Sequence, residues 1–149
     1  MTHLPSMVLA QYLVNQGHGV WWDTRPKPAV TIFKVSYGAM ADEDDRAVSV
    51  MDTDSRNQDA RSHRSGEHTF FPGVQVRVRA LKDRDVNTRL SAIAADLDAL
   101  FCQQVTLETR TYRLQNFSRQ YDPTFLMQEE RNNRRVWVIS GYLTLWEES

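Results

Sequence analysis

The middle of the chain reads Val74-Gln75-Val76-Arg77-Val78-Arg79-Ala80, a strict alternation of apolar and polar side chains. Successive side chains of a β-strand point to opposite faces, so this stretch predicts a strand with the valines on a buried face. Gln75, Arg77 and Arg79 are then expected on a second face that is open to solvent or to a partner.

The residues that follow this strand have the period of an amphipathic helix. Asp83 is expected to cap its N-terminus, and Asp85 suits the positive end of the helix dipole. The helix is predicted to run to residue 103, and its apolar stripe consists of Val86, Leu90, Ile93, Ala94, Leu97, Leu100 and Phe101. A half-buried strand followed by such a helix indicates a sheet that is covered by helices.

Four other segments are predicted to be ordered. Residues 4–17 predict a short helix with Ser6 as its N-cap and Gly17 as its C-terminal stop. Residues 29–37, 105–117 and 135–146 predict strands, whereas residues 118–134 predict a loop. The expected fold is therefore α+β, a four-stranded mixed or antiparallel sheet with two helices packed on one face.

Residues 39–69 differ from the rest because polar and charged side chains dominate them. A segment of roughly 30 residues without a clear apolar period is longer than most connections in compact domains. It is expected to form a long polar insertion between the first two strands. Either an extended hairpin arm, turning near Asp52-Thr53-Asp54-Ser55, or a flexible loop would fit. Residues 1–149 are expected to form a single domain.

The composition limits the classes of protein that fit. The chain has 149 residues, with 18 basic and 19 acidic side chains and a net charge of -1. A protein that binds nucleic acid on its own usually has a basic surplus. A single cysteine, Cys102, cannot form an internal disulfide. No signal peptide or membrane span is apparent, so we expect a soluble protein made in the cytoplasm, with no membrane partner.

The sequence contains no pattern that predicts catalysis. There is no glycine-rich phosphate loop, dinucleotide fingerprint or nucleophile elbow. His63 and His68 lie beside Glu67 in the polar insertion, but zinc ligands normally need better-spaced partners on an ordered frame. Cys102 ends the predicted helix and is expected to be a core residue. The protein is not expected to be an enzyme, and no catalytic, cofactor or metal site is predicted.

Several residues are candidates for contacts with other molecules. Arg77 and Arg79 fit a solvated face with salt bridges, a subunit interface, or the wall of a lumen that faces DNA phosphates. The acidic run could provide the complementary charge on a neighbouring subunit. Exposed tryptophan often marks an interface. The acidic residues are Asp42, Glu43, Asp44 and Asp45, and the aromatic candidates are Trp21, Trp22, Phe70, Phe71 and Phe125.

A resemblance to a known family rests on Phe71-Pro72-Gly73-Val74-Gln75-Val76-Arg77-Val78-Arg79-Ala80 and the helix after it. The segment resembles tailed-phage minor capsid or tail-completion proteins, in which a proline-glycine turn leads into such a strand. The remaining elements agree in order: a short N-terminal helix, an early strand ending in Tyr37-Gly38, and a closing strand at 136–145. The resemblance covers most of the chain except residues 39–69.

The resemblance implies a tail terminator, which forms a ring, typically hexameric, at the head-proximal end of the phage tail. Such a ring stops tail-tube polymerisation and docks to the head–tail connector or stopper. Genomic DNA passes through its lumen without sequence-specific binding. The implied location is the virion, and the implied partners are other copies of the chain, the tail tube protein and the connector. The alternatives are another head–tail connector (a stopper or adaptor), a minor capsid component, or a DNA-binding module.

Overall fold

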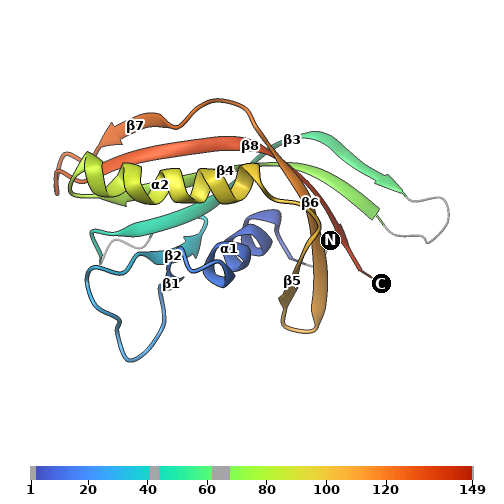
Figure 1. The fold of residues 1–149 in the computed structure, drawn as a ribbon, viewed down its shortest axis with the longest axis horizontal. Coiled ribbons are helices and arrows are strands. Elements are labelled where there is room, and N and C mark those ends of the chain that lie inside the picture. The colour runs from blue at the N-terminus through green and yellow to red at the C-terminus, as the bar shows by residue number, and fades with distance from the viewer. Residues whose placement is uncertain (1–2, 41–43, 62–67, 149) are drawn as a thin grey trace.

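The computed structural model describes residues 3–40, 44–61 and 68–148, which form two helices and eight strands (Figure 1). The strands belong to one mixed sheet in the order β1-β2-β3-β4-β8-β6-β5, and β7 also pairs with β8. The helices are α1 (Pro5–Asn15) and α2 (Asp83–Asp98). The strands are β1 (Val20–Trp21), β2 (Lys34–Tyr37), β3 (Ala47–Arg61), β4 (His68–Ala80), β5 (Gln103–Leu107), β6 (Arg110–Arg119), β7 (Thr124–Gln128) and β8 (Arg135–Glu147).

The α+β class is confirmed, but the prediction of four strands is wrong. The predicted strand at 105–117 is a hairpin of two strands, because the chain turns at Glu108, whose φ is 54°. The predicted loop at 118–134 contains β7. The predicted strand at 29–37 shortens to β2, and the two-residue β1 beside it was not predicted. Short strands at the edges of a sheet carry too few residues for a visible period.

β4 lies at the centre of the sheet and confirms the predicted alternation. Val74, Val76 and Val78 are fully buried, and Val76 pairs with Val50 of β3 on one side and Ile139 of β8 on the other. α2 packs on this face across β4, β8 and β6. Its apolar stripe is buried as far as Leu100. The helix stops earlier than predicted, so Phe101 is exposed.

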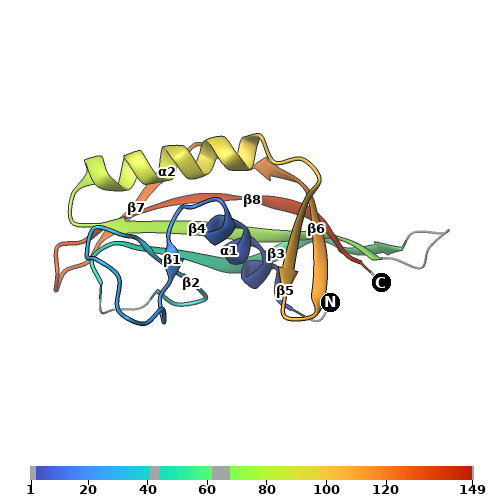
Figure 2. The same ribbon diagram turned by 60° about the horizontal axis from the view of Figure 1, so that its bottom comes forward.

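α1 packs on the same face as α2, as predicted. It contacts β2 and β3 near one edge of the sheet and β5 at the other, because the sheet curls around it (Figure 2). Its Leu9 and Leu13 are fully buried. Gly17 ends the helix region with a φ of 83°, where glycine is favoured.

Two of the predicted caps are wrong. The residue at the N-cap of α1 is Leu4, whereas Ser6 lies in the first turn and donates from Oγ to Asp52 Oδ2 at 2.6 Å. The N-cap of α2 is Lys82. Asp83 instead accepts hydrogen bonds from Arg135 Nε and Trp137 Nε1, both at 2.9 Å. Both side chains therefore tie a helix to the sheet, which the local sequence does not reveal.

The polar segment 39–69 contains a core strand. Val48 and Val50 of β3 are fully buried and pair with Val78 and Val76 of β4. The hairpin does not turn at 52–55, because β3 remains paired with β4 as far as Arg61. Beyond β2 the two strands project from the body as an arm (Figure 1). The extended-arm interpretation is therefore correct for residues 52–61, and the flexible-loop interpretation is wrong for them.

Candidate interaction surface

On the face of the sheet opposite the helices, four side chains lie side by side across β2, β3, β4 and β8: Ser36, Ser49, Arg77 and Val138. Of these four, only Arg77 is not buried. Arg77 is half-buried, and its Nε donates to Gln75 Oε1 at 2.7 Å. Among the described side chains, no carboxylate lies within ion-pair distance of Arg77. Its guanidinium therefore keeps donors that a partner could use.

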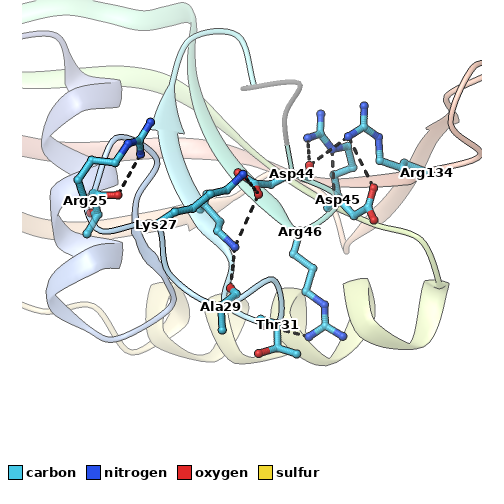
Figure 3. A network of polar contacts seen from close by, with 11 residues as sticks. Arg25, Lys27, Ala29, Thr31, Asp44, Asp45, Arg46 and Arg134 are labelled. Carbon is cyan, nitrogen blue, oxygen red and sulfur yellow. Dashed lines mark hydrogen bonds and ion pairs between the residues drawn. The ribbon is translucent and has the colours of Figure 1, made fainter.

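Arg79 lies on the same face but is only 2% exposed. It donates to the main-chain carbonyls of Asp44 and Asp45, and its Nη1 lies 3.7 Å from Glu129 Oε2. Figure 3 shows Asp44 and Asp45 beside Arg134 at this end of the sheet. These contacts hold the start of β3 against the end of β4. Of the two arginines singled out from the sequence, Arg77 is therefore the one that a partner could reach.

Arg134 is a buried cation that the sequence did not single out. Its Nε lies 2.7 Å from Glu129 Oε1, its Nη1 donates to the Asp44 carbonyl at 3.1 Å, and the side chain is 3% exposed. Arg134 and Glu129 flank the turn between β7 and β8, and Glu129 N donates back to Arg134 O at 2.8 Å. The sequence signal for this ion pair was a glutamate and an arginine on either side of a short turn.

The described residues of the acidic run differ in exposure and in their partners. Asp44 is 9% exposed and lies 3.4 Å from Lys27 Nζ and 3.9 Å from Lys34 Nζ, which is itself buried. The Asp45 side chain is half-exposed and lies 3.8 Å from Arg134. Asp42 and Glu43 lie outside the described residues. Within the described part of the run, Asp45 is the carboxylate with surface to offer a neighbour.

A hollow lies beside Arg77 on the helix-free face. Its volume is about 380 Å³, and Met40, Met51 and Met127 contribute to its wall. Methionine side chains adapt readily to different contacts. Met127 belongs to β7, in which Phe125, Leu126 and Met127 are all about two-fifths exposed. The methionines of the hollow and the exposed side chains of β7 together form an apolar strip beside Arg77.

The aromatic candidates differ in exposure. Phe125 stacks edge-on with Trp137, with ring centroids 5.7 Å apart, and lies under the Arg135 guanidinium. Trp21 packs against the core, whereas Trp22 is 43% exposed. Phe70 and Phe71 are half-buried at the base of the arm. Trp22 and Phe125 are thus the candidates with the most surface available.

Within residues 3–40, 44–61 and 68–148, three or more His, Cys, Asp or Glu side chains are nowhere grouped to hold a metal ion. His63 lies outside the described residues. Cys102 is exposed, so the expectation of a core cysteine is wrong. Neither described helix is long and apolar enough to cross a membrane.

Two side chains have clearly shifted pKa values. Burial raises the pKa of Tyr12, and the nearby Asp96 carboxylate raises it further. The hydrogen bonds from Arg135 and then Trp137 lower the pKa of the Asp83 carboxyl. Both groups connect helices to the rest of the fold, so these shifts concern stability.

The fold and this surface define an α+β protein with one helix-covered and one polar sheet face. No protein-family model matches the chain, and no curated protein is similar in sequence. Among solved structures, the fold is similar to a chain in "Virion of native gene transfer agent (GTA) particle". The TM-score is 0.42 and the identity 16%, over 76% of this chain and 78% of that chain. A likeness this distant carries no functional argument.

Proposed function

We propose that the protein is a structural virion component, a tail terminator that assembles into a closed ring at the head-proximal end of a phage tail. The sequence resemblance around 71–80 suggests the role, and the observation that carries it is the accessible Arg77 on the helix-free face. Arg77 has no ion-pair partner among the described side chains, and its Nε bonds to Gln75 of its own strand.

A ring requires two different, complementary faces on each subunit, so that every copy contacts its neighbours head to tail. The apolar strip of Met40, Met51, β7 and Arg77 is one such face. In this arrangement Arg77 lies in the contact between neighbouring copies. A net charge of -1 lets DNA pass without being held, because tight binding to phosphates requires many cations.

The arm of β3 and β4 is the part of the subunit most suited to reach a different protein. It projects beyond the body at one end (Figure 1). β8 pairs with β4 as far as Thr69, whereas β2 pairs with β3 only as far as Val50, so beyond that point the edge of β3 is open to pairing with a partner strand. The proposed partners are the tail tube protein on one side of the ring and the head–tail connector on the other.

Native mass spectrometry of the purified chain, combined with negative-stain imaging, tests the ring. We expect a single closed oligomer, six copies being the number that the resemblance implies. Arg77→Glu should weaken assembly, because it places a carboxylate in the contact between neighbouring copies. Arg131→Glu, in the exposed turn before β8, is the matched control. A monomer at all concentrations, or full assembly of the Arg77 variant, would contradict the proposal.

A pull-down with tail tube protein separates this role from the alternatives. A terminator binds the end of the tube, whereas a stopper or adaptor placed nearer the head does not. Retention of the ring on tube ends supports the terminator. Binding to the connector alone would assign the chain to another position in the neck.

A further inference from the structure

Two hollows meet at Phe33, at the end of the molecule where α1 ends and α2 begins. The larger, of about 470 Å³, has apolar walls that include Val14, Val20 and Ile32. The smaller, of about 160 Å³, is lined by three arginines, Arg46, Arg84 and Arg89, with one carboxylate, Asp85, and Thr88. Phe33 and Arg89 line both hollows, so an apolar space and a cationic space are adjacent.

At this corner the described carboxylates neutralise only part of the positive charge of the three arginines. Arg46 is paired with Asp85 at 3.5 Å. Asp96 is bound to His18 Nε2, and the other ring nitrogen of His18 lies 3.4 Å from Arg89 Nη1. Among the described side chains, neither Arg84 nor Arg89 has a carboxylate within ion-pair distance. Two guanidinium groups therefore line this corner without an anionic partner.

Arg89 also has a donor that nothing satisfies. Its Nε is buried and has no hydrogen-bond partner among the described residues. Buried polar atoms of native proteins nearly always have partners, so such an atom needs an explanation. A ligand in the hollow would supply an acceptor once the guanidinium turns toward it, because the Nε is enclosed in the present arrangement.

Phe33 holds two of the guanidinium groups in place before any ligand binds. Arg46 and Arg89 lie 5.7 Å and 5.3 Å from the centroid of its ring, within the range of cation–π contacts. Ile32, which lines the larger hollow, is 38% exposed, so part of the rim is apolar as well. Held cations beside an apolar hollow suit a ligand with an acidic and an apolar group.

We propose that this corner binds an acidic segment of a partner protein, in which a carboxylate contacts Arg84 and Arg89 and a neighbouring apolar side chain fills the larger hollow. The apolar walls favour a peptide over a free phosphate, which would leave that hollow empty. A planar guanidinium matches the two oxygens of a carboxylate. The inference is independent of the ring, because none of these residues belongs to the strip around Arg77.

The test uses N-acetyl-leucine as a probe with one carboxylate and one apolar side chain, and N-acetyl-leucinamide as its neutral match. Titration into ¹⁵N-labelled full-length protein follows the Nε–H signals of the arginines by NMR. We expect N-acetyl-leucine to shift the Arg84 and Arg89 signals, and the amide to bind about tenfold more weakly, a difference typical of one lost charge-assisted bond. Arg131→Gln should leave the titration unchanged.

Two variants test the contribution of each arginine to binding of the probe. Arg89→Gln and Arg84→Gln should each weaken binding of the probe by about tenfold. Arg84 is exposed, so Arg84→Gln decides the matter if Arg89→Gln fails to fold. Equal binding of acid and amide, unshifted arginine signals, or tighter binding of phenyl phosphate than of N-acetyl-leucine would overturn the proposal. A failure of the ring in native mass spectrometry would leave this result untouched.

Discussion

Arg134 Nη1 donates a hydrogen bond to the main-chain carbonyl of Asp44 over 3.1 Å, although the two residues lie 90 positions apart in the sequence. The bond joins the turn before β8 to the start of β3, across the end of β4. Arg79 donates to the same carbonyl. The two hydrogen bonds in this buried corner hold the start of β3 to the turn before β8 at one end of the sheet.

We expect Arg134→Ala to destabilise the protein by about 1–3 kcal/mol, because Glu129 and the Asp44 carbonyl lose one of the two guanidinium groups that they contact and keep only Arg79. Urea unfolding followed by circular dichroism measures the free energy of unfolding. Arg131→Ala, three residues earlier and exposed, is the control and should change stability little. If Arg134→Ala lowers the free energy of unfolding no more than the control does, this buried corner makes no net contribution to stability.

The stability that Asp83 contributes should depend on pH in one direction. Its folded pKa lies below the ordinary value of 3.8, so folding favours the charged carboxylate. The contribution is then present above that ordinary value and is lost as the pH falls through the lowered folded pKa. Thermal melts of Asp83→Asn and wild type should differ at neutral pH and converge in strong acid. A difference in melting temperature that stays constant with pH would refute this. The control is Asp23→Asn, at an exposed position, which should melt with the wild type at every pH.

Gly141 is expected to tolerate no side chain. A Cβ at this position in β8 would overlap the Phe117 ring and the Ser118 carbonyl of β6. The strand and the ring would have to move apart, and overpacking of this kind typically costs about 1–3 kcal/mol. Chemical denaturation of Gly141→Ala tests this, with the exposed Ser118→Ala as the comparison. An unchanged midpoint would show that β6 and β8 separate without cost.

Two deletions should separate the arm from the core strand that precedes it. Removing residues 42–66 takes away Val48 and Val50, so we expect no cooperative thermal transition. Removing 55–67 shortens the arm and keeps the buried part of β3, so the transition and the ring should remain while binding to tail tube protein or connector is lost. A shortened arm that still binds both partners would exclude the arm from these contacts.

The strand at 74–80, the helix after it and the closing strand could be predicted, because each buries one face over its whole length and so repeats its period many times. The arginine corner and the hollows at Phe33 could not. Their members come from residues 27–34, the segment 44–46 before β3, β4, α2 and the turn at 129–134, and no spacing in the chain connects them. Val48 and Val50 were equally hidden, because two buried positions within a polar segment show no period.

The sequence by itself determined the α+β class, the central strand with its two faces, and the presence of Arg77 and Arg79 on one of them. Only the tertiary structure decided that these two arginines differ. Asp44, Asp45 and Glu129 converge on Arg79 from other parts of the chain and bury it, whereas Arg77 contacts Gln75 of its own strand. Alternation along a strand sets the face of a side chain, but its exposure depends on what the rest of the chain places over that face.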